Sequence, residues 1–231
     1  MFYLFVNIQK IYNKNLRLSI KTDLENGLLK RCGNSLNYNY LILDGTLLLQ
    51  LLDSIEKDDL LTPSIKNAIF ERFKELIFYA GKGVNNRKFS HLLAGKKICL
   101  KQLALEKITA KFSKIAHIWE KGHGIVVLQL FSETNRYEAL SREFAVIKAL
   151  GLNNLTNANN SCAYGDMKNN WNYNETVNFG NMILFNALTM TVNERPTVLY
   201  KEDITISEIP KRDTTLEKAE LLGILECFLE M

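Results

Sequence analysis

"FYAGKGVNNRKFSHL", residues 78–92, runs from an apolar, strand-like stretch through glycines and asparagines into a helix-like one. Two glycines that bracket a lysine are typical of a phosphate-cradling loop. A Walker A loop would need Gly-Lys-Ser/Thr, which never follows Gly83, and a dinucleotide fingerprint would need a third glycine where Asn86 stands. The stretch therefore predicts a strand, a tight turn and a helix rather than a nucleotide site.

Arg87 and His91 are not explained by a tight turn. If the helix begins near Asn85, the two side chains lie one turn apart on one face, close to a helix N-terminus that attracts anions. An arginine fork beside an imidazole would form a phosphate clamp. A surface pair without function is the simpler alternative, so the pair alone does not decide between the two.

Three stretches rich in aliphatic and aromatic residues predict strands, at 37–44, 76–80 and 124–131. The second is expected to end at Gly81-Lys82-Gly83, and the continuous apolar run of the third favours a central position in the sheet. Helices are predicted at 46–55, 62–77, 85–93, 98–121, 135–152 and 180–192. The expected fold is α/β (α+β), with a small three-stranded sheet flanked by helices.

Residues 98–121 have the pattern of one long helix, because apolar side chains recur at helical spacing with lysines on the other face: Leu105, Ile108, Phe112, Ile115 and Trp119. We expect this stripe to belong to the core. The chain has no internal repeat and no long linker. The simplest division is therefore an N-terminal extension at 1–36, one domain at 37–192 and an acidic C-terminal extension at 193–231.

The chain of 231 residues is 47% hydrophobic and 23% charged, which is the composition of a folded globular protein. No apolar run approaches the roughly 20 residues of a membrane-spanning helix, and the start lacks the basic region and cleavage site of a secretory signal. No Cys-x-x-Cys pair occurs, so we expect reduced thiols in a nuclear and/or cytoplasmic compartment. The four cysteines are Cys32, Cys99, Cys162 and Cys227.

Positive charge gathers in the middle of the chain. Residues 66–121 hold thirteen Lys and Arg against four Glu, whereas residues 194–231 hold five Lys and Arg against nine acidic residues. A basic middle favours a polyanionic partner, although lysine-rich helices are more often simply solvated.

The helix at 135–152 carries a carboxylate on its apolar face. Glu143 falls in the middle of the half formed by Tyr137, Ala139, Leu140, Phe144, Val146, Ile147 and Leu150. The opposite half is expected to face solvent: Glu138, Ser141, Arg142 and Lys148. A buried carboxylate is costly without a positive partner. One alternative is therefore a structural salt bridge or a glutamate at the rim of the core, and the other is a metal ligand or catalytic acid/base. The position favours the functional one.

Together these residues resemble the GIY-YIG nuclease superfamily. Its pattern is a tyrosine in one strand, Tyr-Ile-Gly in a second, Arg-x-x-x-His on a helix, and then a glutamate and an asparagine. The matching residues are Tyr40, Tyr79-Ala80-Gly81, Arg87 with His91, Glu143 and Asn157. Stretches such as "IAHIWEKGHGIVVLQLF" and "CAYG" are most similar to the metazoan ankyrin-repeat and LEM-domain endonuclease branch. The likeness covers residues 37–192.

This chain departs from the superfamily pattern in its first two elements. Gly-Ile-Tyr survives only as Tyr40, and Ala80 replaces the isoleucine of the second element. The ankyrin repeats and LEM domain of the larger members of the branch are absent, so we expect a fragment or a reduced form.

The resemblance implies hydrolysis of a DNA phosphodiester with one divalent cation, Mg²⁺ or Mn²⁺. Glu143 would bind the metal, since hard cations prefer carboxylate oxygen. Tyr40 would take the proton of the attacking water, which its ordinary pKa of about 10 allows only if nearby cations lower it. Arg87 would stabilise the charge that develops on phosphorus.

The resemblance implies that the remaining motif residues orient the reactants and support the site. Tyr79 and His91 would orient the water or the phosphate, and Asn157 would hold the site together by hydrogen bonding. Contacts with DNA phosphates are expected from Lys82, Lys96 and Lys97. The branch implies branched or bridging DNA as substrate, in DNA repair and genome maintenance. The alternatives are an inactive nucleic-acid-binding module of the same fold and a structural protein in which Glu143 and Arg87 form a salt bridge.

Overall fold

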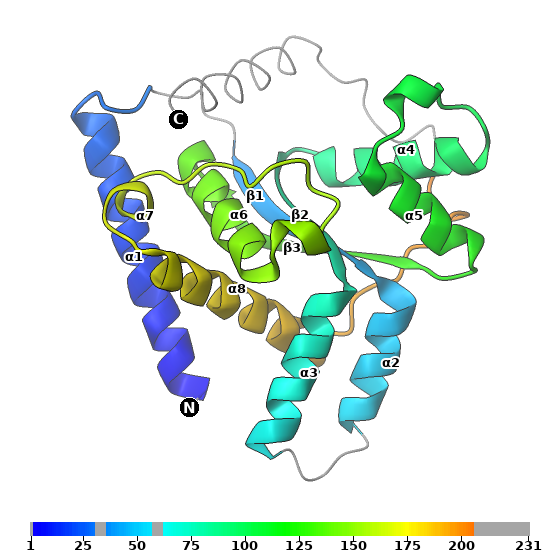
Figure 1. Ribbon diagram of the computed structural model, residues 1–231, viewed down its shortest axis with the longest axis horizontal. Helices are drawn as coiled ribbons and strands as arrows, with labels where there is room; N and C mark the ends of the chain where they lie inside the picture. The colour runs from blue at the N-terminus through cyan, green and yellow to red at the C-terminus, as the bar shows by residue number, and fades with distance from the viewer. Residues whose placement is uncertain (1, 31–35, 57–61, 206–231) are drawn as a thin grey trace.

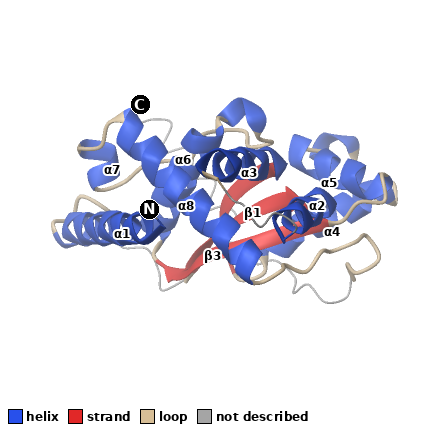
Figure 2. Ribbon diagram, turned by 90° about the horizontal axis from the view of Figure 1, so that it is seen from below, coloured by secondary structure: helices blue, strands red, loops and turns tan. Residues whose placement is uncertain are grey.

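The computed structural model describes residues 2–30, 36–56 and 62–205. Within these residues, a three-stranded antiparallel sheet lies between two groups of helices, as Figures 1 and 2 show. The strands are β1 (Asn37–Asp44), β2 (Ile77–Val84) and β3 (Ile125–Thr134), in the order β2-β1-β3. This is the α/β architecture that the sequence predicts.

The α-helices are α1 (Phe2–Glu25), α2 (Gly45–Glu56), α3 (Pro63–Leu76), α4 (Arg87–Cys99), α5 (Ala110–Glu120), α6 (Arg136–Leu150), α7 (Asp166–Asn169) and α8 (Tyr173–Asn193). Two short 3₁₀ turns, η1 (Leu105–Lys107) and η2 (Leu152–Asn154), complete the set. The helices predicted at 46–55, 62–77 and 135–152 are confirmed as α2, α3 and α6. Those predicted at 85–93 and 180–192 exist but are longer.

The central strand is β1, so the central position expected for residues 124–131 is wrong. Helices cover both faces of β1, and its residues are buried from Asn37 to Leu43. β3 lies at an edge, where Ile125 forms a bridge with Leu199. The segment around Leu199 covers the start of this edge strand. This is why the sequence of β3 is as apolar as that of a central strand.

β2 continues through its glycines to Val84, so the expected end of the strand at Gly81 is wrong. Gly81 and Gly83 pair with Tyr40 and Tyr38 of β1. A Cβ on Gly81 would lie 2.9 Å from Oη of Tyr40, and one on Gly83 would lie 2.9 Å from Cζ of Tyr38. The two tyrosine rings occupy the space that side chains would need, which is the reason for glycines inside this strand.

The single helix predicted at 98–121 is also wrong, because the chain turns back between α4 and α5. Lys101 has a left-handed φ of 55°, and Leu105, assigned by its spacing to the core stripe, is 84% exposed. The two helices then pack side by side on one face of the sheet, with Leu92 and Ile115 in the same buried cluster. Apolar residues happen to recur at helical spacing on both sides of this turn, so the pattern alone could not reveal the break.

The other face of the sheet is covered by α6, α8 packs against α6, and α1 packs against α6, α7 and α8. Leu16 and Ile20 of α1 are fully buried in this second core. Because α1 and the segment around Tyr164 cover it, most of the half of α6 expected to face solvent is buried: Glu138, Ser141 and Arg142. That expectation is wrong for these three residues, whereas the division of the chain at 36 and 192 stays a prediction.

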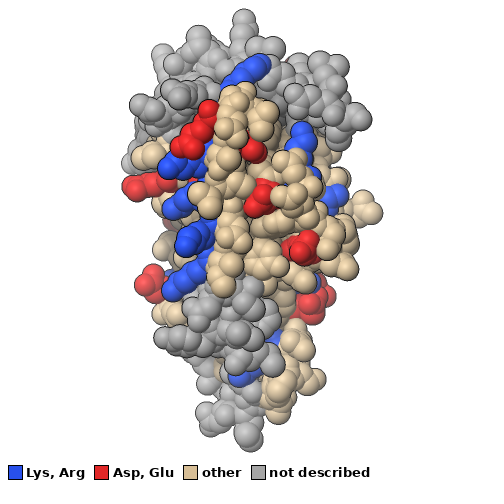
Figure 3. All heavy atoms as spheres, turned by 90° about the vertical axis from the view of Figure 1, so that its left-hand side faces the viewer, with Lys and Arg blue, Asp and Glu red and all other residues tan. Residues whose placement is uncertain are grey.

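The outer face of α1 is basic. Figure 3 shows Lys and Arg side chains in a column on this side of the molecule. The exposed cations of α1 are Lys10, Lys14, Arg17 and Lys21. In Figure 1, α1 lies on the opposite side of the sheet from α4 and α5.

Cys162 takes part in a disulfide bond, whereas Cys99 is a free thiol. The expectation of reduced thiols is therefore wrong for Cys162, since wide spacing in a sequence does not set distance in a fold. Cys32, Cys227 and most of the acidic tail lie outside the described residues. Among the helices of the described ranges, none is both long and apolar enough to cross a membrane.

Candidate active site

Tyr40 lies in the middle of the central strand, with its side chain buried beside α4. Its hydroxyl is hydrogen-bonded to Nε2 of His91 at 2.6 Å, and the two rings are stacked with centroids 5.9 Å apart. Burial, reinforced by the nearby Tyr79, raises the pKa of Tyr40 well above its usual value, although Arg87 lowers it. Because the cations do not outweigh burial, Tyr40 is a neutral partner of His91.

Tyr79 stands beside Tyr40 on the neighbouring strand, with ring centroids 5.9 Å apart. A Cβ on Gly81 would lie 2.7 Å from Cε1 of Tyr79. Gly81 therefore leaves room for both tyrosines at once. Ala80 belongs to the core on the other side of the sheet, so its small side chain affects packing rather than the tyrosine cluster.

The start of α4 is held against the sheet by Tyr38. Its hydroxyl donates to the carbonyl of Asn85 at 2.8 Å and accepts from the backbone N–H of Lys88 at 3.3 Å. Asn85 has a φ of 50°, a left-handed conformation that asparagine tolerates, and this turns the chain into the helix. Arg87 is the first residue of α4, and His91 follows one turn later. The signal for Tyr38 in the sequence is its alternation with Tyr40 along the strand.

Glu143 belongs to α6, which packs against β2. Its side chain is half-buried, and the hydroxyl of Ser161 donates to Oε2 at 3.2 Å. Burial raises the pKa of Glu143 to about 7, against the opposing influence of Lys82, Ser161, Arg87 and Lys111. The carboxylate predicted to lie on an apolar helix face therefore lies among cations from three other elements.

Asn157 closes the outer edge of β2. Its side-chain amide donates to the carbonyl of Ala80 at 2.7 Å and accepts from the N–H of Ala80 at 3.2 Å. Its neighbour Thr156 hydrogen-bonds the carbonyl of Phe78 through both its N–H and its hydroxyl, each at 2.8 Å. The segment after α6 thus satisfies the free edge of β2 and anchors the strand that carries Tyr79.

This arrangement of a tyrosine pair, an Arg-x-x-x-His helix and a glutamate across the sheet has a counterpart among known families. Residues 37–206 match the LEM-3-like GIY-YIG domain. The chain belongs to this GIY-YIG family.

Two curated relatives illustrate the similarity. The chain is 32% identical over 163 residues to the human ankyrin repeat and LEM domain-containing protein 1, covering 67% of this chain and 26% of that protein. It is 27% identical over 181 residues to the Caenorhabditis elegans homolog, covering 77% of this chain and 24% of that protein. This chain thus spans about a quarter of the length of the curated relatives it matches. No solved structure matches it.

Besides Tyr38, two residues of this GIY-YIG domain were not predicted from the sequence. Ser161 holds the carboxylate of Glu143, and Lys111 of α5 lies over the ring of Tyr79. Neither belongs to the motif pattern. The sequence did not indicate Lys111, because the predicted helix at 98–121 placed it on a solvated, lysine-rich face. It did not indicate Ser161, because this residue lies in a loop without periodicity.

The three lysines predicted to contact DNA lie in different surroundings. Lys82 is on β2, where its charge acts on Glu143. Lys96 and Lys97 are in the last turn of α4, at the other end of the helix from Arg87. The ammonium of Lys96 donates to the carbonyl of Ile204 at 2.6 Å, so a phosphate would have to compete for it.

The donors around Glu143 fit one hard cation. A carboxylate and a hydroxyl offer oxygen, which Mg²⁺ and Mn²⁺ prefer, and Mg²⁺ keeps several waters, so a single carboxylate suffices. A carboxyl whose pKa is raised by burial is also one that added positive charge would stabilise. In the described ranges, no group of three or more His, Cys, Asp and Glu forms a closed metal site.

Proposed function

We propose that this domain is a divalent-metal-dependent DNA endonuclease that hydrolyses phosphodiester bonds. Membership of the GIY-YIG family supports a nuclease. The observation that carries the proposal is the hydrogen bond between Tyr40 and His91, beside the cations that act on Glu143. These groups provide a proton acceptor, positive charge for a phosphate, and a carboxylate for a metal.

Tyr40 and His91 supply a route for the proton. Attack of water on phosphorus forms one P–O bond while the bond to the leaving oxygen breaks, and the water gives up a proton. The hydroxyl of Tyr40 would accept this proton as it passes its own to Nε2 of His91, 2.6 Å away. Because burial makes a free phenolate costly, a transfer that never leaves Tyr40 ionised suits this environment.

Arg87 and Glu143 carry opposite charges and would have different roles at the phosphate. Arg87 would stabilise the charge that develops on the phosphate oxygens, as a planar fork at the start of α4. Glu143 would hold Mg²⁺ or Mn²⁺, with Ser161 fixing the orientation of its carboxylate. When bound, the cation would polarise the phosphate and stabilise the leaving oxygen.

The proposal extends to the substrate and the location of the protein. The resemblance to the ankyrin-repeat and LEM-domain branch favours branched or bridging DNA, in DNA repair and genome maintenance. The named relatives are LEM domain-containing proteins, with which a nuclear location is compatible.

The test is cleavage of a branched and a linear DNA duplex with Mg²⁺, with Mn²⁺ and with chelator, using wild-type protein and Glu143→Gln. Glu71→Gln, an exposed glutamate of α3, is the matched control. Metal-dependent cleavage is expected in wild type and in the control, and its loss is expected in Glu143→Gln, because an amide binds a hard cation far more weakly. At pH 8 the metal should also raise the melting temperature of wild type but not of Glu143→Gln.

Wild-type rates from folded Glu143→Gln would remove Glu143 from the mechanism. Salt-sensitive DNA binding without cleavage under any metal condition would instead favour the inactive nucleic-acid-binding module. If the protein neither bound nor cleaved DNA, the result would favour a structural protein in which the charges of Glu143 and Arg87 serve stability alone.

A further inference from the structure

Lys111, the second residue of α5, reaches the tyrosine and histidine cluster from an element that supplies no motif residue. Its Nζ lies 3.8 Å from the centroid of the Tyr79 ring and 3.3 Å from Nε2 of His91. The side chain is half-buried, so its charge acts on these groups with less screening than in bulk water.

The place of Lys111 is set by the packing of α5 against α4. Thr109 caps the first turn of α5. Gly95 of α4 faces Ile115, and a Cβ on Gly95 would lie 2.4 Å from Cγ2 of Ile115. The missing side chain lets the helices approach closely, which brings the start of α5 to His91.

The contacts at Nε2 of His91 determine which atom carries the proton. An ammonium group can only donate, so Nε2 must offer its lone pair to Lys111. The hydroxyl of Tyr40, 2.6 Å from the same nitrogen, must then also donate to it. The proton of the neutral ring therefore belongs on Nδ1, and Nε2 is open to accept a proton from Tyr40.

We propose that Lys111 is a positioning residue for DNA cleavage, which holds His91 in the tautomer whose Nε2 accepts the proton of Tyr40. The inference rests on the proposed nuclease function. During the step, the proton leaves the oxygen of Tyr40 and binds the lone pair on Nε2 of His91, from which the ammonium of Lys111 withdraws without gaining or losing a proton. Its charge keeps the imidazole neutral before the step, and moving the ammonium away from Nε2 lowers the cost of protonating the ring during the step.

The experiment compares three variants with wild type. Lys111→Met keeps the aliphatic stem and removes the charge and donors, and Lys111→Arg keeps a charged donor. Lys148→Met is the matched control, because Lys148 lies over the ring of Phe144 at 5.2 Å without being part of the tyrosine and histidine cluster. Each protein is assayed for single-turnover cleavage at saturating DNA and for DNA affinity at several salt concentrations.

Lys111→Met should lower the cleavage rate at saturating DNA by about tenfold or more, with DNA affinity changed by less than about twofold. Lys111→Arg should recover part of the rate, and Lys148→Met should match wild type. An unchanged rate in Lys111→Met would overturn the inference. So would a decrease confined to affinity with a shallower salt dependence, which would make Lys111 a phosphate ligand. Should Lys111→Met fail to fold, Lys111→Gln replaces it.

A second readout does not need activity. Nitrogen chemical shifts of the three histidines distinguish the tautomers, and wild-type His91 should carry its proton on Nδ1. In Lys111→Met the ring should shift toward the other tautomer or toward protonation. An identical His91 in both proteins would refute the positioning role even if the rate fell. If wild type cleaved no DNA with any metal, the nuclease proposal would fail while this readout still decided the contact of Lys111 with His91.

Discussion

Glu143 combines a half-buried position with an ionisable carboxyl, and burial raises its pKa to about 7. The folded protein keeps a proton on Glu143 up to about pH 7, whereas the unfolded chain releases it near 4.5. The stability from this protonated group is fully present below pH 4.5 and is lost as the pH rises through 7. At about 1.4 kcal/mol per pKa unit, the loss is at most about 3 kcal/mol, and less because the side chain is partly exposed.

Glu143→Gln should therefore stabilise the metal-free protein at pH 8 and leave its stability nearly unchanged at pH 4.5. Urea unfolding of both proteins at the two pH values measures the difference, and other titrating groups cancel in the comparison. Equal stability of the two proteins at both pH values would show that the carboxylate is well solvated or well paired by the surrounding cations.

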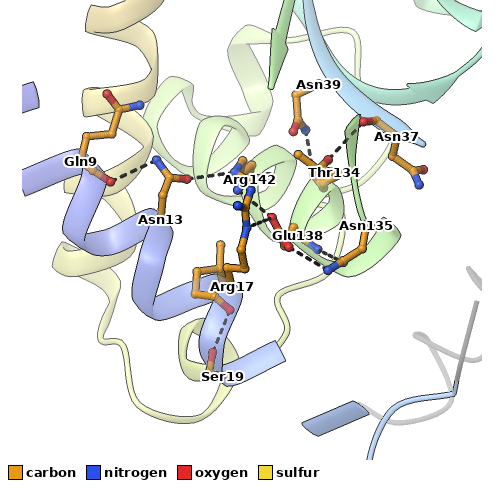
Figure 4. A network of polar contacts seen from close by, with 12 residues as sticks. Gln9, Asn13, Arg17, Ser19, Asn37, Asn39, Thr134, Asn135, Glu138 and Arg142 are labelled. Carbon is orange, nitrogen blue, oxygen red and sulfur yellow. Dashed lines mark hydrogen bonds and ion pairs between the residues drawn. The ribbon is translucent and has the colours of Figure 1, made fainter. Parts of the chain in front are cut away.

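At the scale of elements, the contact between α1 and α6 is built on buried charge, as Figure 4 shows. Nη2 of Arg142 donates to Oε2 of Glu138 at 3.0 Å, and its Nε donates to Asn13 at 3.0 Å. Arg17 of α1 approaches the same carboxylate at 3.4 Å, and Asn135 donates to its other oxygen at 2.8 Å. Glu138 thus binds an arginine from each helix. These directional contacts fix how α1 lies on α6, which a hydrophobic contact alone would not do.

Glu138→Ala should destabilise the protein by about 3–5 kcal/mol, because it leaves Arg142 buried without its carboxylate. Glu75→Ala, which removes the exposed ion pair with Arg72 at 2.7 Å, should cost less than about 1 kcal/mol. Urea unfolding compares the two. Similar small losses would mean that α1 can move away and let water reach Arg142.

At the scale of the whole molecule, basic residues occupy two separate sides. One side has α4 and α5, which begin at the tyrosine and histidine cluster, and the other has the cation column of α1 (Figures 1 and 3). The family match begins at residue 37 and so leaves α1 out. We expect DNA to follow the side of α4, because Arg87 starts that helix.

Lys97→Gln should therefore make the salt dependence of DNA binding shallower. The slope of log affinity against log salt should fall by about 0.9 for each phosphate that the protein no longer neutralises. Lys14→Gln on α1 should leave the slope unchanged, although it removes the same charge. The reverse result, a change with Lys14→Gln alone, would place the DNA track over α1.

Much of this fold is predictable from local pattern. The strand at 37–44, three of the helices and the α/β class follow from apolar spacing and turn residues, and the structure confirms them. The motif residues are also recognisable by type and order, and the structure brings Tyr40, Tyr79 and His91 into one cluster. Their roles stay predictions.

The sequence by itself determined most of the helices and strands between residues 37 and 192 and the family that the chain resembles, because propensity, spacing and motif order are properties of neighbouring residues. It predicted neither α1 nor the break between α4 and α5. Tertiary structure alone decided that β1 is central, that Glu138 and Arg142 are buried, and that Lys111 meets His91. The physical reason is that burial and contact depend on which elements pack together. Here α1 covers α6, and the turn between α4 and α5 brings Lys111 back to the tyrosines.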